Sequence, residues 1–127
     1  EKEQLAVEYG PAPIAVEVDP RHLRQIMTNL SENALVHTAG PDRPARILVR
    51  VARAEGPARA LVEVRDDGPG IDDAAATEIF DPFYTTRASG TGLGLYIARE
   101  LAQTNGIRLQ YERNRPQGSC FRLLFVG

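Results

Sequence analysis

The stretch SGTGLGLYIARE (residues 89–100) places a cluster of glycines directly before an apolar stripe with helical spacing. The glycines are Gly90, Gly92 and Gly94, and the stripe consists of Leu93, Ile97 and Leu101, flanked by Ala98 and Ala102. Glycine costs about 1 kcal/mol relative to alanine inside a helix, so glycines at a helix start need an explanation. One explanation is a flexible loop with a helix cap. The other is a backbone without Cβ atoms, which lets an anion approach the N–H groups at the helix start.

The composition narrows the class of protein before any motif is considered. The chain has 127 residues, 43% of them hydrophobic, which is enough to bury a core and typical of one domain. A net charge of −2 and a pI near 5.7 argue against binding to nucleic acid or to an anionic membrane. A single cysteine, Cys120, excludes an internal disulfide. We therefore expect residues 1–127 to form one monomeric domain, cut from a longer chain.

The order of hydrophobic patterns predicts a two-layer α/β (α+β) sandwich. Alternating apolar residues predict strands over 5–9, 14–18, 46–54, 58–65, 107–113 and 119–126, the first two joined by a turn and the last two forming a hairpin. Helices are predicted from Pro20, behind an Asp19 N-cap, to about His37, over 72–80 and over 92–105, with a loop over 81–91. This order favours a mixed, mostly antiparallel sheet with about three helices on one face.

The first predicted helix carries two asparagines on one side, away from an apolar face of Leu23, Ile26, Met27, Leu30 and Ala34. Asn29 and Asn33 are four residues apart, and His37 lies one turn further on. Asparagine is unfavourable inside a helix because its amide competes with the backbone, so the pair needs a reason. The two amides either face solvent or point at a metal bound to phosphate. Mg²⁺ fits the metal alternative, because it takes oxygen ligands, keeps several waters and so requires few protein ligands.

A second candidate site is VRDDGPGI (residues 64–71), at the end of a predicted strand. Asp66 offers a carboxylate acceptor there, and Gly68 and Gly70 let the backbone turn sharply and approach a flat ligand closely. An ordinary turn from a strand into a helix explains the same residues equally well.

A third candidate is IFDPFYTTRASGTGLGL (residues 79–95). Phe80 and Phe83 are predicted aromatic anchors on either side of a proline, unless they are plain core residues. Arg87 either reaches a terminal phosphate or is a solvated surface charge. The glycines do not form a P-loop, which needs a lysine and a Ser/Thr after its glycines. They do not form a dinucleotide fingerprint either, because no hydrophobic strand leads directly into them.

Together, the patterns N-x-x-x-N, D-x-G-x-G, F-x-x-F and G-x-G-x-G follow one another along nearly the whole chain. In this order they resemble the ATP-binding catalytic domain of sensor histidine kinases, a fold shared with gyrase, the Hsp90 chaperones and MutL. The stretch GTGLGLYIARELAQTNGIRLQYERNRPQGSCFRLLF (residues 90–125) looks most similar to the sensor kinases of type IV pilus and nitrogen regulation. The resemblance implies that the chain binds ATP or ADP with Mg²⁺ and passes the γ-phosphate to a histidine on a separate dimerisation domain.

The resemblance also implies roles for individual residues. Asp66 would accept a hydrogen bond from the adenine amino group, with Gly68 and Gly70 beside the base. Residues 81–91 would form a mobile lid over the phosphates. The implied metal ligands are Asn33 and Asn29, and the implied catalytic residues are Asn29, Asn33 and Arg87. The implied nucleotide contacts are Asn33, His37, Asp66, Gly68, Gly70, Ile71, Phe80, Phe83, Thr86, Arg87, Gly90, Thr91, Gly92, Leu93, Gly94 and Leu95.

The chain departs from the family pattern in two ways. Val36 stands where many relatives have lysine, three residues after the second asparagine. A phosphoacceptor histidine with an acidic neighbour is missing, because His22 follows Asp19 and Pro20 inside the first helix and His37 lies within the asparagine motif. The resemblance therefore implies an upstream dimerisation and phosphoacceptor domain and a response regulator as a partner of the full-length protein. It also implies a cytoplasmic domain of a protein anchored in the bacterial inner membrane.

Two other kinds of protein remain open. A gyrase- or chaperone-type ATPase resembles this chain but carries a glutamate, acting as the base for water, at the position of Asn29. An amide cannot accept a proton at neutral pH, so Asn29 favours phosphoryl transfer over hydrolysis. Glu32 is acidic and nearby, although it lies about 100° around the helix from Asn33. The second alternative is an anti-sigma-factor-like serine kinase, whose motif likewise tends to carry the glutamate.

Overall fold

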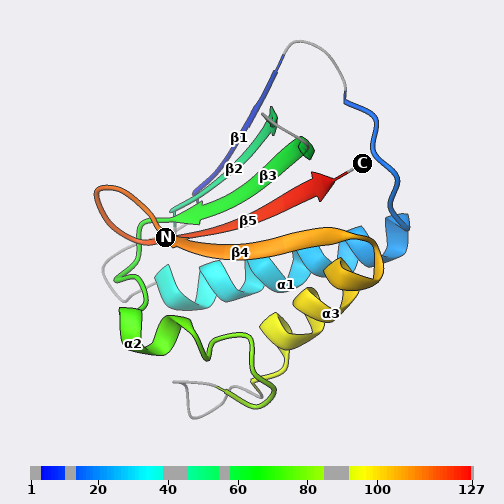
Figure 1. Cartoon of the computed structure of the whole chain (residues 1–127). Coiled ribbons are helices and arrows are strands. Elements are labelled where there is room, and N and C mark those ends of the chain that lie inside the picture. Colours follow the sequence, from blue (N-terminus) through cyan, green and yellow to red (C-terminus); the bar gives the residue numbers. More distant parts are fainter. Residues whose placement is uncertain (1–3, 11–13, 39–45, 55–57, 85–91, 127) are drawn as a thin grey trace.

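A mixed β-sheet forms one of the two layers of the protein (Figure 1). The computed structural model describes residues 4–10, 14–38, 46–54, 58–84 and 92–126. Within these ranges the sheet has five strands in the order β1-β2-β3-β5-β4. Their bounds are Gln4–Tyr9 (β1), Arg46–Arg53 (β2), Ala58–Asp66 (β3), Ile107–Arg113 (β4) and Ser119–Val126 (β5). β1 pairs in parallel with β2 and all other neighbours are antiparallel, which confirms the predicted mixed sheet.

Helices cover one face of this sheet. The long helices α1 (Pro20–Thr38) and α3 (Gly94–Thr104) lie side by side beneath it, and the short α2 (Asp73–Ala76) follows the end of β3 (Figure 1). Asp19 caps α1 as predicted, because its Oδ1 accepts the backbone N–H of Arg21 at 2.9 Å. α1 packs on β2 and β3, and α3 packs on β4. None of the helices in the described ranges has the length and hydrophobicity needed to cross a bilayer.

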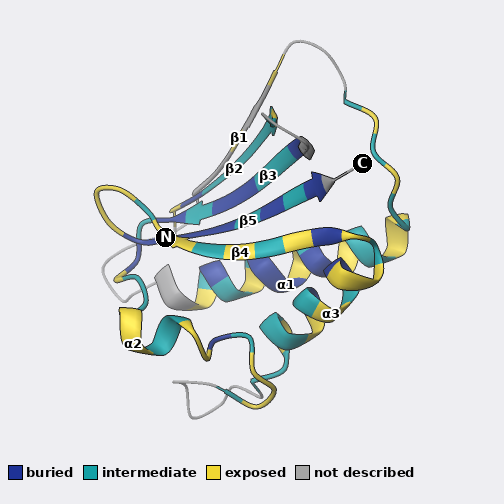
Figure 2. Ribbon diagram, in the orientation of Figure 1, coloured by how far each residue is buried: buried dark blue, intermediate teal, exposed yellow. Residues whose placement is uncertain are grey.

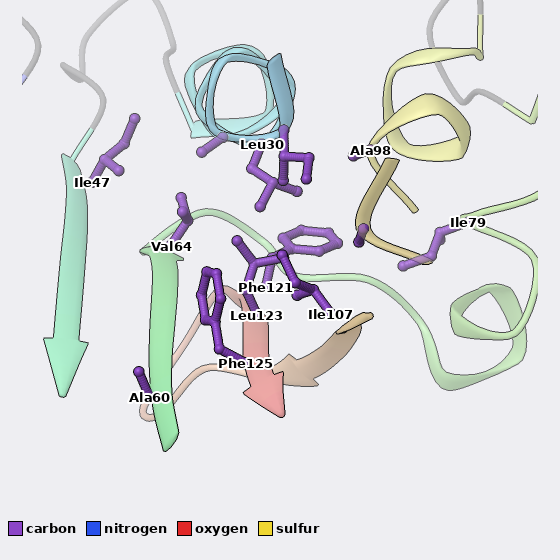
Figure 3. Close-up of a cluster of buried hydrophobic side chains, with 13 residues drawn as sticks. Leu30, Ile47, Ala60, Val64, Ile79, Ala98, Ile107, Phe121, Leu123 and Phe125 are labelled. Carbon is purple, nitrogen blue, oxygen red and sulfur yellow. The ribbon is translucent and has the colours of Figure 1, made fainter. Parts of the chain in front are cut away.

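The hydrophobic core lies between the sheet and the two long helices (Figures 2 and 3). Ile26 and Leu30 of α1 are fully buried, and so is Phe121 of β5, which lies below Leu30 in the close-up. Leu23 and Met27 are partly buried, so the predicted apolar face of the first helix is confirmed. The buried members of the core are Ile26, Leu30, Ala34, Ile47, Ala60, Val64, Ile79, Ala98, Ala102, Ile107, Phe121, Leu123 and Phe125.

The prediction of a strand over residues 14–18 is wrong. Ile14, Val16 and Val18 do pack against the core, and the residues between them are exposed, but the segment forms no strand in the described structure. Its alternation comes from packing rather than from a ladder of hydrogen bonds. β1 instead pairs in parallel with β2, which follows α1 in the chain. Parallel neighbours need a long crossover connection, and the segment that contains α1 provides it.

The apolar stripe predicted for α3 is centred differently in the structure. Ala98 and Ala102 are fully buried, whereas Ile97 is 38% exposed. Small side chains allow α3 to approach α1 closely, so the flanking alanines form the packed face. The helix begins at Gly94 rather than at the predicted residue 92.

A buried carboxylate lies on the sheet face opposite to the helices. Because Val64 points into the core, its neighbour Glu63 points to the other face, and it is 2% exposed. Arg122 and Arg65 approach its two oxygens at 2.8 Å each, and Arg50 lies at 3.4 Å. Burial by itself would raise the pKa of Glu63. The hydrogen bond from Arg122 and the charges of Arg65 and Arg122 outweigh burial and lower that pKa.

Candidate functional site

Asp66 stands at the end of β3 with its carboxylate buried. The residue is 3% exposed, and its Oδ1 accepts the backbone N–H groups of Gly68 at 3.0 Å and of Ser119 at 3.2 Å. An aspartate that bonds to the backbone two residues further on stabilises a turn. The two donors come from different segments of the chain. They fix the orientation of the carboxylate, as recognition of a ligand requires.

The β4–β5 hairpin holds the backbone of Asp66. Asn114 Nδ2 donates to the Asp66 carbonyl oxygen at 2.8 Å. Gly118 has a φ of +110°, and a Cβ atom there would lie 1.9 Å from the same oxygen, so only glycine fits. Sequence reasoning missed Asn114, Gly118 and Ser119. The turn sequence NRPQG (residues 114–118) marked the hairpin but gave no sign of its contact with Asp66.

The loop after Asp66 is tied to β4. Gly70 has a φ of 82°, a conformation that favours glycine. Ile71 packs against the core, and its N–H donates to Tyr111 Oη at 3.1 Å. The Ile71 carbonyl oxygen accepts from Arg113 Nη2 at 3.4 Å. The D-x-G-x-G segment is therefore a loop held by long-range contacts.

The two predicted aromatic anchors differ in the structure. Phe80 packs edge-on against Phe121, with ring centroids 6.1 Å apart, and the guanidinium carbon of Arg99 lies 5.8 Å from the Phe80 centroid. Phe83 is 73% exposed, so the prediction that its side chain is an anchor is wrong. Its backbone makes the contact instead, because the Phe83 N–H donates to the Gly92 carbonyl at 2.8 Å.

Asn29 is buried, with 9% exposure, which excludes the solvent-facing alternative for this amide. Its Nδ2 donates to the carbonyl oxygen of Gly94, the first residue of α3, at 3.0 Å. Its Oδ1 accepts from Gln25 Nε2 at 2.7 Å. Sequence reasoning missed Gln25, although its spacing of four residues before Asn29 places both on one side of the helix.

The start of α3 is open beside Gly94. Apart from the neighbouring backbone, no atom of the described residues lies within 4 Å of the position that a Cβ atom at Gly94 would occupy. Leu93, just before the helix, is half-buried, and Leu95 packs against the core. Packing within the described residues therefore does not require a glycine at position 94. The anion explanation of this glycine requires such an open helix start.

The remaining predicted residues are placed only in part. Asn33 is half-buried on α1, one turn after Asn29, and the backbone of His37 belongs to α1 while its side chain lies outside the described part. Thr86, Arg87, Gly90 and Thr91 lie outside the described residues. The C-terminal ends of α1 and β3 lie on the same side of the molecule as α2 (Figure 1). Across the described ranges, no group of three or more His, Cys, Asp or Glu side chains could hold a metal ion.

The sequence and the structure of the chain are both similar to those of known proteins. Residues 18–126 match the family described as histidine kinase-, DNA gyrase B- and HSP90-like ATPases. The chain is 37% identical over 123 residues to the sensor protein kinase PilS of Pseudomonas aeruginosa, which covers 97% of this chain and 23% of PilS. The structure is similar to the catalytic domain of the histidine kinase ThkA in a nucleotide-free form, with a TM-score of 0.82 and 29% identity over 97% of this chain and 78% of that one. It is also similar to full-length ShkA in complex with AMPPNP, with a TM-score of 0.78 and 26% identity over 98% of this chain and 26% of that one.

The family match runs from the residue before Asp19 to Val126 and so includes every motif of the candidate site. The similarity to the ThkA catalytic domain confirms the predicted α/β sandwich. The chain spans about a quarter of the length of PilS and of ShkA. PilS is named a sensor protein kinase and ThkA a histidine kinase. The chain belongs to the family of histidine kinase-, DNA gyrase B- and HSP90-like ATPases.

Proposed function

We propose that this chain binds ATP with Mg²⁺ and positions the γ-phosphate for transfer to a histidine on another domain of the full-length protein. The observation that carries the proposal is the buried carboxylate of Asp66, held by the N–H groups of Gly68 and Ser119. A carboxylate fixed in this way accepts a hydrogen bond from an exocyclic amino group, which adenine presents. Guanine presents a carbonyl oxygen at that position, which would place two acceptors against each other.

The phosphates are assigned to the start of α3. The N-terminus of a helix favours anions, and no side chain of the described residues fills the space beside Gly94. Asn33 is assigned to Mg²⁺, because an amide oxygen suits a cation that takes oxygen ligands, and the bound cation offsets phosphate charge. Arg87 is assigned to the terminal phosphate, and Gly68 and Gly70 to the base. Further nucleotide contacts are proposed for His37, Ile71, Phe80, Phe83, Thr86, Gly90, Thr91, Gly92, Leu93 and Leu95.

The relatives support a proposal for the other partners. PilS is named a sensor protein kinase, and ShkA binds the nucleotide analogue AMPPNP. By analogy, residues 1–127 form one catalytic domain of a longer protein whose dimerisation and phosphoacceptor domain lies upstream. The full-length protein then passes the phosphate to a response regulator. It is anchored in the bacterial inner membrane, with this domain in the cytoplasm and monomeric by itself. Assignment to the type IV pilus or nitrogen-regulation sensors stays a prediction.

Hydrolysis is the less favoured function, because the site offers no base at position 29. The amide of Asn29 makes two hydrogen bonds within the protein and cannot accept a proton. Glu32, the acidic residue three positions after Asn29, is exposed on α1. An ATPase would need a carboxylate within reach of the attacking water.

Calorimetry with ADP and GDP tests the proposal. ADP is expected to bind more tightly than GDP. Asp66→Ala is expected to weaken ADP binding about ten- to a hundredfold, since a lost hydrogen bond to a charged group is worth about 1.5–3 kcal/mol. Asp72→Ala is the matched control, because Asp72 is exposed and its side chain makes no cap hydrogen bond. Unchanged ADP affinity in Asp66→Ala would remove Asp66 from the site, and a wild-type chain that binds no ADP would overturn the function.

A further inference from the structure

A chain of hydrogen bonds runs from Gln25 through Asn29 to the first residue of α3. Gln25 Nε2 donates to Asn29 Oδ1 at 2.7 Å, and Asn29 Nδ2 donates to the Gly94 carbonyl oxygen at 3.0 Å. A backbone carbonyl can only accept, so the Asn29 amide must turn its NH₂ group to Gly94 and its oxygen to Gln25. Gln25 in turn must present its NH₂ group. The three residues therefore leave one orientation for each amide.

The α1–α3 pair is tied at its other end by a similar contact. Asn105, the residue that follows α3, accepts the backbone N–H of Asp19 with Oδ1 at 2.9 Å. Its Nδ2 donates to the carbonyl oxygen of Leu101 at 2.8 Å. One buried or half-buried asparagine thus fixes each end of the helix pair. Asn105 lies far along α3 from Gly94 and so provides a comparison for Asn29.

We propose that Asn29 is a positioning residue, oriented by Gln25, that fixes the start of α3 against α1 and is not a ligand of the metal. A cation at Asn29 Oδ1 would face the NH₂ hydrogens of Gln25, whose nitrogen is 2.7 Å from that oxygen. The bond to Gly94 holds the first turn of α3 in one direction, so its N–H groups are oriented before a ligand arrives. The assignment of a nucleotide phosphate as the ligand of this turn rests on the proposed function. The contact between Asn29 and Gly94 does not depend on it.

Hydrogen exchange in the nucleotide-free chain tests the contact. Asn29→Ala is expected to speed exchange about tenfold at the first hydrogen-bonded amides of α3, those of Ile97 and Ala98. The variant lacks one of the hydrogen bonds that must break before this end of the helix opens, so opening costs less free energy. Asn105→Ala is expected to act on the last turn of α3 and leave the first unchanged. Gln25→Ala changes an exposed residue, so the chain is expected to fold, and it is expected to give part of the Asn29→Ala effect. The double variant is expected to add little to Asn29→Ala alone.

Calorimetry with ADP, in Mg²⁺ and in EDTA, separates positioning from metal binding. Asn29→Ala and Gln25→Ala are expected to weaken ADP binding by the same factor in both conditions, about three- to tenfold for one hydrogen bond. Asn33→Ala is expected to weaken it only in Mg²⁺. Asn105→Ala is expected to leave the affinity unchanged.

Two results would overturn the proposal. One is a loss of ADP affinity in Asn29→Ala that occurs in Mg²⁺ but not in EDTA, which would make Asn29 a metal ligand. The other is unchanged exchange in the first turn of α3 in both Asn29→Ala and Gln25→Ala. If the wild-type chain binds no nucleotide, the proposed function fails, and the exchange measurement still decides whether Asn29 fixes the helix.

Discussion

Phe83 and Gly92 are joined through their backbones, and both have positive φ angles, 68° and 74°. The Phe83 N–H donates to the Gly92 carbonyl oxygen at 2.8 Å. A Cβ atom at position 92 would lie 2.3 Å from the carbonyl carbon of Phe83. These two residues bracket residues 84–91, most of the segment that the family resemblance assigns to a lid. Their contact therefore sets where that segment leaves and rejoins the fold.

Gly92→Ala is expected to lower the free energy of unfolding by about 3 kcal/mol, because it combines a positive φ with a backbone clash. Gly106→Ala is the matched control. Gly106 has a φ of +70°, but none of the described residues has an atom within 4 Å of the added Cβ atom, so only the conformational cost of about 1 kcal/mol is expected. Urea denaturation measures both. Equal losses in the two variants would show that the Phe83 contact does not constrain Gly92.

Gly94→Ala is expected to separate stability from binding. Alanine is the better helix former, and its Cβ atom would meet no atom of the described residues at this position, so the free energy of unfolding should rise by up to about 1 kcal/mol. If a phosphate approaches the open start of α3, the added methyl group should weaken ADP binding about tenfold. Thermal unfolding and calorimetry on the same sample measure the two effects. A more stable variant with unchanged affinity would place the phosphates elsewhere.

Residues 81–91 are expected to gain protection from hydrogen exchange when nucleotide binds. The segment carries few apolar residues beyond the exposed Phe83, so nucleotide contacts would supply most of its order. The measurement compares the chain with and without a non-hydrolysable ATP analogue, with the peptide over β3 as the internal reference. Strong and equal protection in both states would identify a rigid structural element rather than a lid.

Glu63→Gln is expected to destabilise the protein at pH 7 by about 2 kcal/mol, because it leaves Arg65 and Arg122 without their buried carboxylate. The folded-state pKa of Glu63 is lowered, so its contribution is present above its ordinary pKa of 4.5 and is lost as the pH falls below that value. The difference between wild type and variant should therefore shrink in acid. Glu112→Gln, at a residue that pairs with Arg122 but is 59% exposed in its side chain, is expected to change stability by at most about 0.5 kcal/mol. A pH-independent difference in urea denaturation would contradict this account.

The chain by itself is expected to bind labelled Mg·ATP without gaining acid-labile phosphate. His22 contacts Asn105, with 2.9 Å between Nδ1 and Nδ2, and its side chain is only 33% exposed, as fits a structural residue. Adding the upstream domain as a separate chain should restore transfer slowly, because tethering normally supplies a high effective concentration. Asn33→Ala should abolish this transfer and His22→Ala should preserve it. Labelling of His22 would contradict transfer between domains, and rapid phosphate release without an acceptor would favour the ATPase alternative.

Local features of this protein were determined by the sequence itself. The alternation over residues 107–113 and 119–126 predicts β4 and β5 with their bounds, and Asp19 with Pro20 predicts the start of α1. These elements follow from neighbouring residues, because side-chain periodicity and capping bonds act over a few positions. The order of the four motifs was likewise readable in the sequence, and it led to the family.

Contacts between distant segments were decided only by the tertiary structure. Asn29 is hydrogen-bonded to Gly94, 65 positions away in the sequence, and Asn114 to Asp66, 48 positions away. No local sequence pattern predicts either contact. Residues 14–18 show a strand-like alternation, yet β1 takes its partner from beyond α1, and the exposure of Ile97 follows from the close packing of Ala98 and Ala102. Periodicity tells which residues avoid water, but the element they pack against depends on how the whole chain closes around its core.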